Sequence, residues 1–407
     1  MSKVSQDRSV VHRTLPDAQG SLNLSVSRAF DRPFAQLPKP AVLVGGSIYS
    51  RPSFGTNHPL SYTRQSAVME MCRLLGWLDE DNFRPSPQAH LATLRRVHDP
   101  AYLHALKAAS DQGSVTPEWR ERFKFGTMEN PLFPHVFERA ATTVGGSILS
   151  AQLALLGHVV FHPAGGTHHG RPDHASGFCY FNDPVFALLT FLDAGLDRVL
   201  YVDVDAHHGD GVFDYFADEE RVACISIHER DRWPNTGLLE DQSARRLNLP
   251  VPPRINDAEY ELAWRQMVMP YVARLDPQAI VITCGADALA GDPLSHMELS
   301  NNALWHAVLE LCALPAASVV LGGGGYNPWT TVRCWAGLWG LLSAGDWPDN
   351  LPEGARAIFA GFDSDLVDED EVEDHWLQSL GDPLQAGEVR PELAALVQHL
   401  RAVHGFA

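Results

Sequence analysis

The chain has 407 residues, 45% of them hydrophobic and 20% charged, which is typical of a folded globular protein and excludes a disordered one. Its 31 basic and 50 acidic residues give a formal net charge of −19; because nucleic-acid-binding domains carry a basic face, we expect no direct nucleic-acid binding. No apolar run reaches the ~18 residues of a membrane span, and the six cysteines lack C-x-x-C spacing, so we expect a reduced, cytoplasmic protein.

The ends of the chain differ from its middle. Residues 1–40 are polar and proline-containing, and we interpret them as an N-terminal extension. A single domain is predicted over 41–390, with a solvated acidic segment at 362–376 near its end and a C-terminal tail at 391–407.

Between these ends, short apolar runs alternate with helical patterns. The predicted strands are 41–49, 158–166, 198–205, 221–228, 245–252, 279–287 and 318–326. The predicted helices are 63–78, 134–157, 183–195, 257–275, 301–314 and 331–345. Continuously apolar strands are typical of parallel sheets buried on both faces, so the alternation predicts an α/β domain with a mostly parallel sheet flanked by helices.

Clusters of polar residues and glycines follow four of these strands. They read GGTHHG (165–170), DVDAHHGDG (203–211), CGADALAGD (284–292) and GGGGY (322–326). In open parallel sheets, ligand sites form outside the carboxyl ends of the strands. We therefore expect the four clusters to contribute to one site.

The DVDAH stretch has the residues of a metal site. Alternate residues of an extended chain share a side, so Asp203, Asp205 and His207 can point the same way. A catalytic zinc usually takes three protein ligands and leaves one position open, and Asp287 is the best further candidate. Its other interpretation is an aspartate that caps a helix or turn.

The adjacent His168 and His169 suggest acid–base chemistry. Next to a metal, one of them could act as a general base, provided that carboxylates fix its tautomer. Asp203 and Asp210 remain for that task, although capping or surface histidines remain an alternative. Tyr326 follows four glycines that no GK[ST] accompanies, so this is no phosphate loop; its hydroxyl could donate to an oxyanion, or simply pack.

Taken together, the motifs resemble those of zinc-dependent histone deacetylase-type amidohydrolases of the arginase/deacetylase superfamily, especially bacterial members similar to acetoin-utilisation deacetylases. The resemblance covers about 45–345 and rests on HPLSYTR (58–64), VHDPAYL (97–103), GGTHHGRPDHASGFCYFND (165–183), VLYVDVDAHHGDGV (199–212), WPNTG (233–237), GADALAGDP (285–293) and LGGGGYNPWTTVRCW (321–335). It implies the three-layer arginase/deacetylase fold.

The resemblance also implies roles for individual residues. The implied zinc ligands are Asp205, His207 and Asp287, and the implied catalytic residues are His168, His169, Tyr326, Asp203 and Asp210, with His169 as the general base and acid. The implied substrate-binding residues are Phe178, Trp233, Leu294, Glu129, Gly177 and Gly324. Arg64 would line an internal product channel. A structural potassium ion would bind at Asp203, Asp205, His207, Ser226 and Ile227, and a second at Phe216, Glu219 and Val222.

Two positions depart from the family pattern. Glu129 stands where an aspartate usually grips the substrate backbone, and Trp233 stands where the tunnel usually has Phe. The implied reaction is hydrolysis of acyl-amides, with acetyl-lysine in proteins or peptides as substrate. Acetylated polyamines or other small acylated amines are the alternative, which Leu294 disfavours because it is not an acidic gatekeeper.

Two rival interpretations remain. An arginase-like enzyme with two manganese ions would need a second Asp-x-Asp pair, which GADALAGD lacks. A non-catalytic binding protein on the same scaffold would not need the metal ligands, the two histidines and the tyrosine, and this sequence has all of them. The sequence leaves open whether the chain forms a homo-oligomer.

Overall fold

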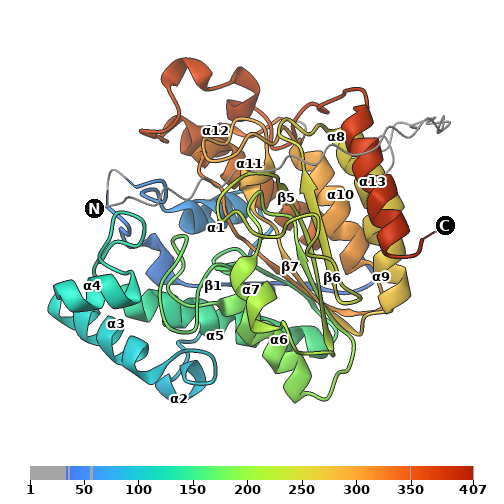
Figure 1. Ribbon diagram of the computed structural model, residues 1–407. Coiled ribbons are helices and arrows are strands. Elements are labelled where there is room, and N and C mark those ends of the chain that lie inside the picture. Colours follow the sequence, from blue (N-terminus) through green and yellow to red (C-terminus); the bar gives the residue numbers. More distant parts are fainter. Residues whose placement is uncertain (1–33, 35–36, 56–57, 349, 407) are drawn as a thin grey trace, which may run out of the picture.

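A single sheet of parallel strands forms the centre of the protein (Figure 1). The computed structural model describes residues 34, 37–55, 58–348 and 350–406. The eight strands lie in the order β2-β1-β3-β8-β7-β4-β5-β6. Their bounds are β1 Ala41–Gly45, β2 Phe83–Pro85, β3 Val159–His162, β4 Val199–Asp203, β5 Val222–Glu229, β6 Arg246–Val251, β7 Ala279–Thr283 and β8 Ala317–Leu321.

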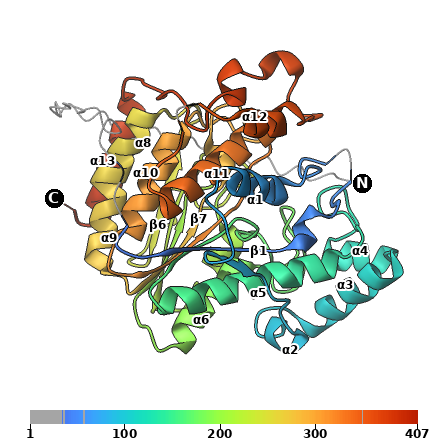
Figure 2. The ribbon, with the colours of Figure 1, turned by 180° about the vertical axis from the view of Figure 1, so that it is seen from behind.

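Helices cover both faces of the sheet (Figure 2). Alternate strand residues enter two separate cores: Leu200 and Val202 pack with one set of helices, while Val199 and Tyr201 pack with the other. The first set is α1 Arg64–Leu74, α8 Asp257–Ala263, α9 Met269–Leu275, α10 Asn301–Cys312, α11 Pro328–Ser343, α12 Glu353–Ala360 and α13 Pro391–Val403. The second includes α3 Pro100–Gln112, α4 Pro117–Phe123, α5 Val136–Leu155, α6 Asp183–Asp193 and α7 Asp210–Tyr215, with the short α2 Leu91–Leu94. The predicted α/β three-layer fold is confirmed.

The long predicted elements match the structure closely, with the exception of the helix expected at 257–275. It is interrupted by a π-helical turn, Trp264–Val268, directly before α9. Pro270 has no N–H to donate to the carbonyl of Gln266, four residues earlier. The Arg401 side chain donates to the Gln266 carbonyl instead, at 2.7 Å, so this carbonyl keeps a hydrogen-bond partner.

The C-terminal segment differs from the expected tail. It contains α13, whose Leu393, Leu396, Val397 and Leu400 recur at helical spacing and are buried in the core. The expected N-terminal extension lies mostly outside the described residues, although Phe34 packs against the core. In the acidic segment, two 3-10 turns, Glu369–Glu371 and Asp374–Leu377, stand on the surface, and Trp376 anchors the second. Within the described residues, no helix has the length and apolarity to cross a bilayer.

Candidate active site

The four polar clusters belong to four strands that are neighbours in the sheet. The order β3-β8-β7-β4 places the carboxyl ends of these strands side by side. The histidine pair follows β3, the glycines and Tyr326 follow β8, Asp287 follows β7, and the Asp–x–His pair follows β4. Residues that are up to 158 positions apart (168 to 326) thus meet at one edge.

Asp205, His207 and Asp287 form a buried group that could hold a metal ion. One ligand atom from each lies within 4.8 Å of the other two. Backbone amides orient the carboxylates: Gly324 N donates to Asp205 Oδ2 at 2.6 Å, and Ala206 N donates to Asp287 Oδ1 at 3.0 Å. Two carboxylates and an imidazole fit a divalent transition metal such as zinc, and burial of the two carboxylates is costly unless a cation compensates them.

The backbone at Gly324 passes close to the carboxylates of the candidate metal group. A Cβ added at Gly324 would lie 2.0 Å from Asp287 Oδ2, so a side chain there would collide with a candidate ligand. The glycines after β8 therefore let the backbone reach the carboxylates that it orients.

His168 is held by a buried carboxylate. Its Nδ1 lies 2.7 Å from Asp203 Oδ2, and the Tyr201 hydroxyl donates to the same oxygen at 2.7 Å. Burial lowers the pKa of His168, but the carboxylates of Asp203 and Asp205 outweigh burial and raise this pKa to about 9. His168 is therefore suited to carry positive charge beside the metal group.

His169, unlike His168, favours the neutral form of its imidazole. Its Nδ1 lies 2.7 Å from Asp210 Oδ1, and its ring centroid lies 3.9 Å from that of His168. Burial, together with repulsion from His168, lowers the pKa of His169 to about 4. A neutral imidazole whose Nδ1 donates to a carboxylate leaves Nε2 free to accept a proton.

Tyr326 completes the inner site. Asp292 Oδ2 accepts from the Tyr326 backbone N–H at 2.7 Å. Burial, followed by the carboxylates of Asp287 and Asp205, raises the pKa of the Tyr326 hydroxyl well above its ordinary value. The hydroxyl therefore stays protonated and can act as a hydrogen-bond donor.

An outer pocket of about 360 Å³ leads from the surface to these groups. Its lining consists of Glu129, His169, Gly177, Phe178, His207, Arg232, Trp233, Leu294 and Tyr326. Trp233 is 41% exposed, and its ring stands edge-on to that of His169, with 4.5 Å between the ring centroids. Glu129 Oε1 accepts from the Gly177 N–H at 2.6 Å, so this rim carboxylate fixes the turn that presents Phe178. The expected substrate-binding residues thus lie together, with Gly324 at the inner end.

Two of the residues expected to bind potassium, Asp205 and His207, belong to the candidate metal group. Asp203 and Ser226 are register partners on β4 and β5, and Ile227 follows, fully buried. Phe216, Glu219 and Val222 lie in the connection from α7 to the start of β5.

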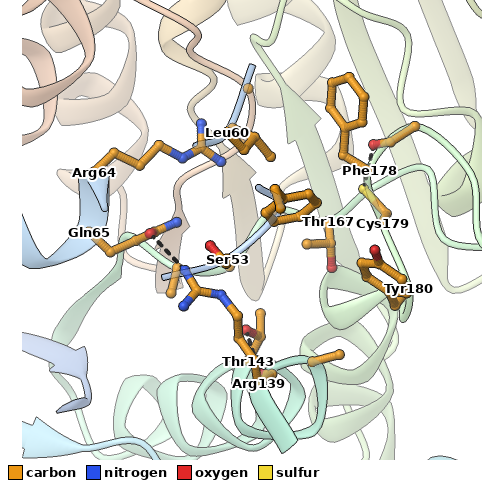
Figure 3. Close-up of a pocket in the computed structure, with 18 of the residues that line it drawn as sticks. Ser53, Leu60, Arg64, Gln65, Arg139, Thr143, Thr167, Phe178, Cys179 and Tyr180 are labelled. Carbon is orange, nitrogen blue, oxygen red and sulfur yellow. Dashed lines mark hydrogen bonds between the residues drawn. The ribbon is translucent and has the colours of Figure 1, made fainter. Parts of the chain in front are cut away.

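Behind the inner site, a chamber with about 90 Å³ of space for water-sized molecules extends into the protein. Arg64 lies in its wall, and Arg64 Nη1 donates to the Gly325 carbonyl at 3.0 Å. Figure 3 shows Arg64 and Gln65 from α1, and Arg139 and Thr143 from α5, opposite Phe178, Cys179 and Tyr180. The chamber and the outer pocket share His169, Gly177, Phe178 and Tyr326 as lining residues, so the two spaces meet at these residues.

Sequence reasoning missed several supporting residues. Arg171 forms ion pairs with Asp210 and Asp214, Tyr201 donates to Asp203, and Asp292 holds the backbone of Tyr326. Arg171 and Asp292 lie within the quoted motifs. Their signal in the sequence was a charged residue close to a cluster of candidate ligands. Arg139 gave no signal, since an arginine inside an amphipathic helix is usually a surface residue.

Known proteins are similar to this chain in sequence. Residues 58–342 match the family model described as "Histone deacetylase domain". The chain is 31% identical to the acetoin utilization protein AcuC of Bacillus subtilis over 316 residues, 74% of this chain and 81% of that protein. It is 32% identical to histone deacetylase 9 of Arabidopsis thaliana over 319 residues, 76% of this chain and 73% of that protein.

Solved structures agree with the sequence relatives. A crystal structure of an HDAC homolog complexed with SAHA matches with a TM-score of 0.84 and 31% identity, over 89% of this chain and all (100%) of that one. The HDAC homolog from Aquifex aeolicus matches with a TM-score of 0.84 and 30% identity, over the same shares, 89% and 100%. The chain therefore belongs to the histone deacetylase family, a family of amide hydrolases.

Proposed function

We propose that the chain removes acetyl groups from lysine side chains of proteins or peptides by zinc-dependent hydrolysis. The observation that carries this proposal is the meeting of three groups at the bottom of one pocket: the Asp205–His207–Asp287 set, the His169–Asp210 pair and the Tyr326 hydroxyl. A pocket lined by the aromatic rings of Phe178 and Trp233 suits an unbranched side chain such as acyl-lysine.

The proposed reaction adds water across the amide bond. A zinc ion held by Asp205, His207 and Asp287 would supply Lewis-acid polarisation of the acyl carbonyl and lower the pKa of water in the site. His169 Nε2 takes a proton from the attacking water while Asp210 holds Nδ1. The Tyr326 hydroxyl donates a hydrogen bond to the oxyanion that forms on the acyl carbon.

The same groups complete the reaction. His169 returns its proton to the leaving nitrogen, the C–N bond breaks, and a carboxylate and a free amine result. His168, held by Asp203, contributes positive charge next to the oxyanion. Structural potassium at Asp203, Asp205, His207, Ser226 and Ile227 is part of the proposal, as is a cytoplasmic location.

A mononuclear centre is favoured over a binuclear one. Among the described residues, the single group with the spacing of a metal site has three members, and no further carboxylate bridges it. Metal analysis of the purified protein should therefore find one zinc per chain.

Comparing turnover of an acetyl-lysine peptide with that of acetylated polyamines tests the substrate class. We expect the peptide to be preferred, since the rim residue Leu294 is aliphatic and offers no carboxylate to a second ammonium group. A zinc chelator should abolish the activity, and added zinc should restore it. Preference for the polyamines would identify the small-molecule alternative, and no turnover of either class after zinc loading would contradict the proposed function.

A further inference from the structure

Two guanidinium groups line the inner chamber, and none of its described lining residues carries a carboxylate. Arg64 and Arg139 both line it, and neither aspartate nor glutamate is among its lining residues in the described part of the chain. Neither guanidinium has an ion pair with a carboxylate there. Arg139 donates instead to neutral oxygens, the Ile48 carbonyl at 3.1 Å and Gln65 Oε1 at 3.3 Å.

This arrangement is costly without an anion. Arg64 is buried, at 8% exposure, and its guanidinium stacks over Trp335 at 5.0 Å, while that of Arg139 stacks over Tyr49 at 5.2 Å. Burial, with repulsion from Arg64, lowers the pKa of Arg139 to about 10, so Arg139 remains charged at neutral pH. Arg139 is partly exposed, but the two guanidinium groups line the same space, and together they attract an anion that can accept from both.

The position of the chamber indicates where such an anion comes from. A substrate that enters the outer pocket places its acyl carbonyl beside Tyr326 and His169, the residues at which the two spaces meet. The remainder of its acyl chain then extends toward the arginines. An apolar acyl chain would leave both guanidinium groups unpaired, whereas a chain that ends in a carboxylate would pair with them.

We propose that the Arg64–Arg139 chamber binds the terminal carboxylate of dicarboxylic acyl groups, so that succinyl- and glutaryl-class acyl-lysines are substrates. This inference rests on the proposed function and extends it to a substrate class. In the reaction, water adds to the same acyl carbon, the same C–N bond breaks, and the products are a dicarboxylate and free lysine.

The test compares two substrates of the same length, of which one ends in a charged carboxylate and the other in a neutral amide. Peptides with succinyl-lysine and with succinamoyl-lysine have the same chain length, but the second ends in a neutral amide. For the zinc-loaded protein we expect kcat/KM to be at least about tenfold higher for succinyl, as two charge-assisted contacts would give. In Arg139→Met this ratio should fall to about one, and Arg139→Lys should retain part of it. Arg120→Met, on an exposed arginine of α4, should keep the full ratio.

A second measurement does not depend on catalysis. Succinate should raise the melting temperature of the protein more than succinamate does, and the difference should vanish in Arg139→Met. Equal kcat/KM values with a retained succinate effect would identify a free carboxylate product as the occupant and overturn the inference about substrate. If the protein hydrolyses acetyl-lysine but shows neither the preference for succinyl-lysine nor the stabilisation by succinate, the inference about the chamber is overturned and the proposed function stands. No turnover of any acyl-lysine overturns the proposed function, and the melting experiment then still decides whether the chamber binds carboxylates.

Discussion

At the residue scale, Tyr326 carries a single hydroxyl whose loss should be visible mainly in turnover. The Tyr326→Phe variant keeps the ring that packs against Phe178, with 5.8 Å between centroids, and removes the donor. Removal of one oxyanion donor typically costs ~10²–10³ in rate. We expect kcat on an acetyl-lysine peptide to fall by about that factor, with zinc content and melting temperature unchanged. Unchanged kcat would contradict the oxyanion role.

Gly324 tests the metal group by a steric change. In Gly324→Ala the new Cβ would lie 2.0 Å from Asp287 Oδ2 and 3.0 Å from Asp205 Oδ2, so a candidate ligand must move. We expect metal analysis to find far less than stoichiometric zinc in this variant. Gly46→Ala is the matched control, since the nearest atom to its added Cβ is 3.7 Å away. Full zinc occupancy in Gly324→Ala would show that the group does not hold the metal.

At the element scale, Asp257 connects three segments. It begins α8, and its carboxylate accepts from the backbone N–H of Ser300 at 2.9 Å, next to α10, and of Gln385 at 2.7 Å, before α13. Burial, with help from Asp382, raises its pKa from 3.8 to about 6. The folded state therefore binds a proton that the unfolded state has released between these two pH values.

This shift predicts a pH dependence of stability with a definite sign. Because the folded pKa is raised, the favourable contribution of Asp257 is fully present below about pH 4 and is lost as the pH rises to about 6. Asp257→Asn does not titrate. The free energy of unfolding of the variant minus that of the original protein should rise by roughly 2–3 kcal/mol between pH 4 and pH 7, measured by urea unfolding. A difference that is flat with pH would refute the shift.

Prediction from sequence worked where a local pattern decides the structure. The apolar runs that became β4, β5 and β7 were identified within a few residues, because strands buried on both faces must be continuously apolar. β2, three residues long and only partly buried, has no such pattern. The π-helical turn at Trp264–Val268 lies just before Pro270, a local signal for a break, but the pairing of the Gln266 carbonyl by the distant Arg401 has no local signal.

The candidate site, too, could be predicted from the sequence in one part and not in another. The residue types after the strands predicted which side chains could form it, and the strand order that places β3, β8, β7 and β4 together explains why they meet. The chamber is different, since it depends on how α1 and α5 pack. Arg64 and Arg139, 75 positions apart (64 to 139), become neighbours only through tertiary structure.

At the scale of the whole molecule, the metal group joins strands from the middle of the sheet, so zinc should stabilise the entire fold. Asp205 and His207 follow β4 and Asp287 follows β7, and these strands pair directly in parallel. Without a cation, the two buried carboxylates repel each other. A ligand that binds only the folded state adds about 4 kcal/mol at a thousandfold excess over its Kd, which for a chain of this size corresponds to a melting-temperature change of roughly 5 °C.

Chelation of zinc followed by a melting experiment tests this expectation. The metal-free protein should melt at a lower temperature, zinc should restore the original value, and magnesium should not, because it prefers octahedral oxygen ligands. In Gly324→Ala, added zinc should produce little change, since its candidate ligands are displaced. If the protein melts at the same temperature after metal analysis has verified complete removal of zinc, the Asp205–His207–Asp287 group does not couple metal binding to the stability of the sheet.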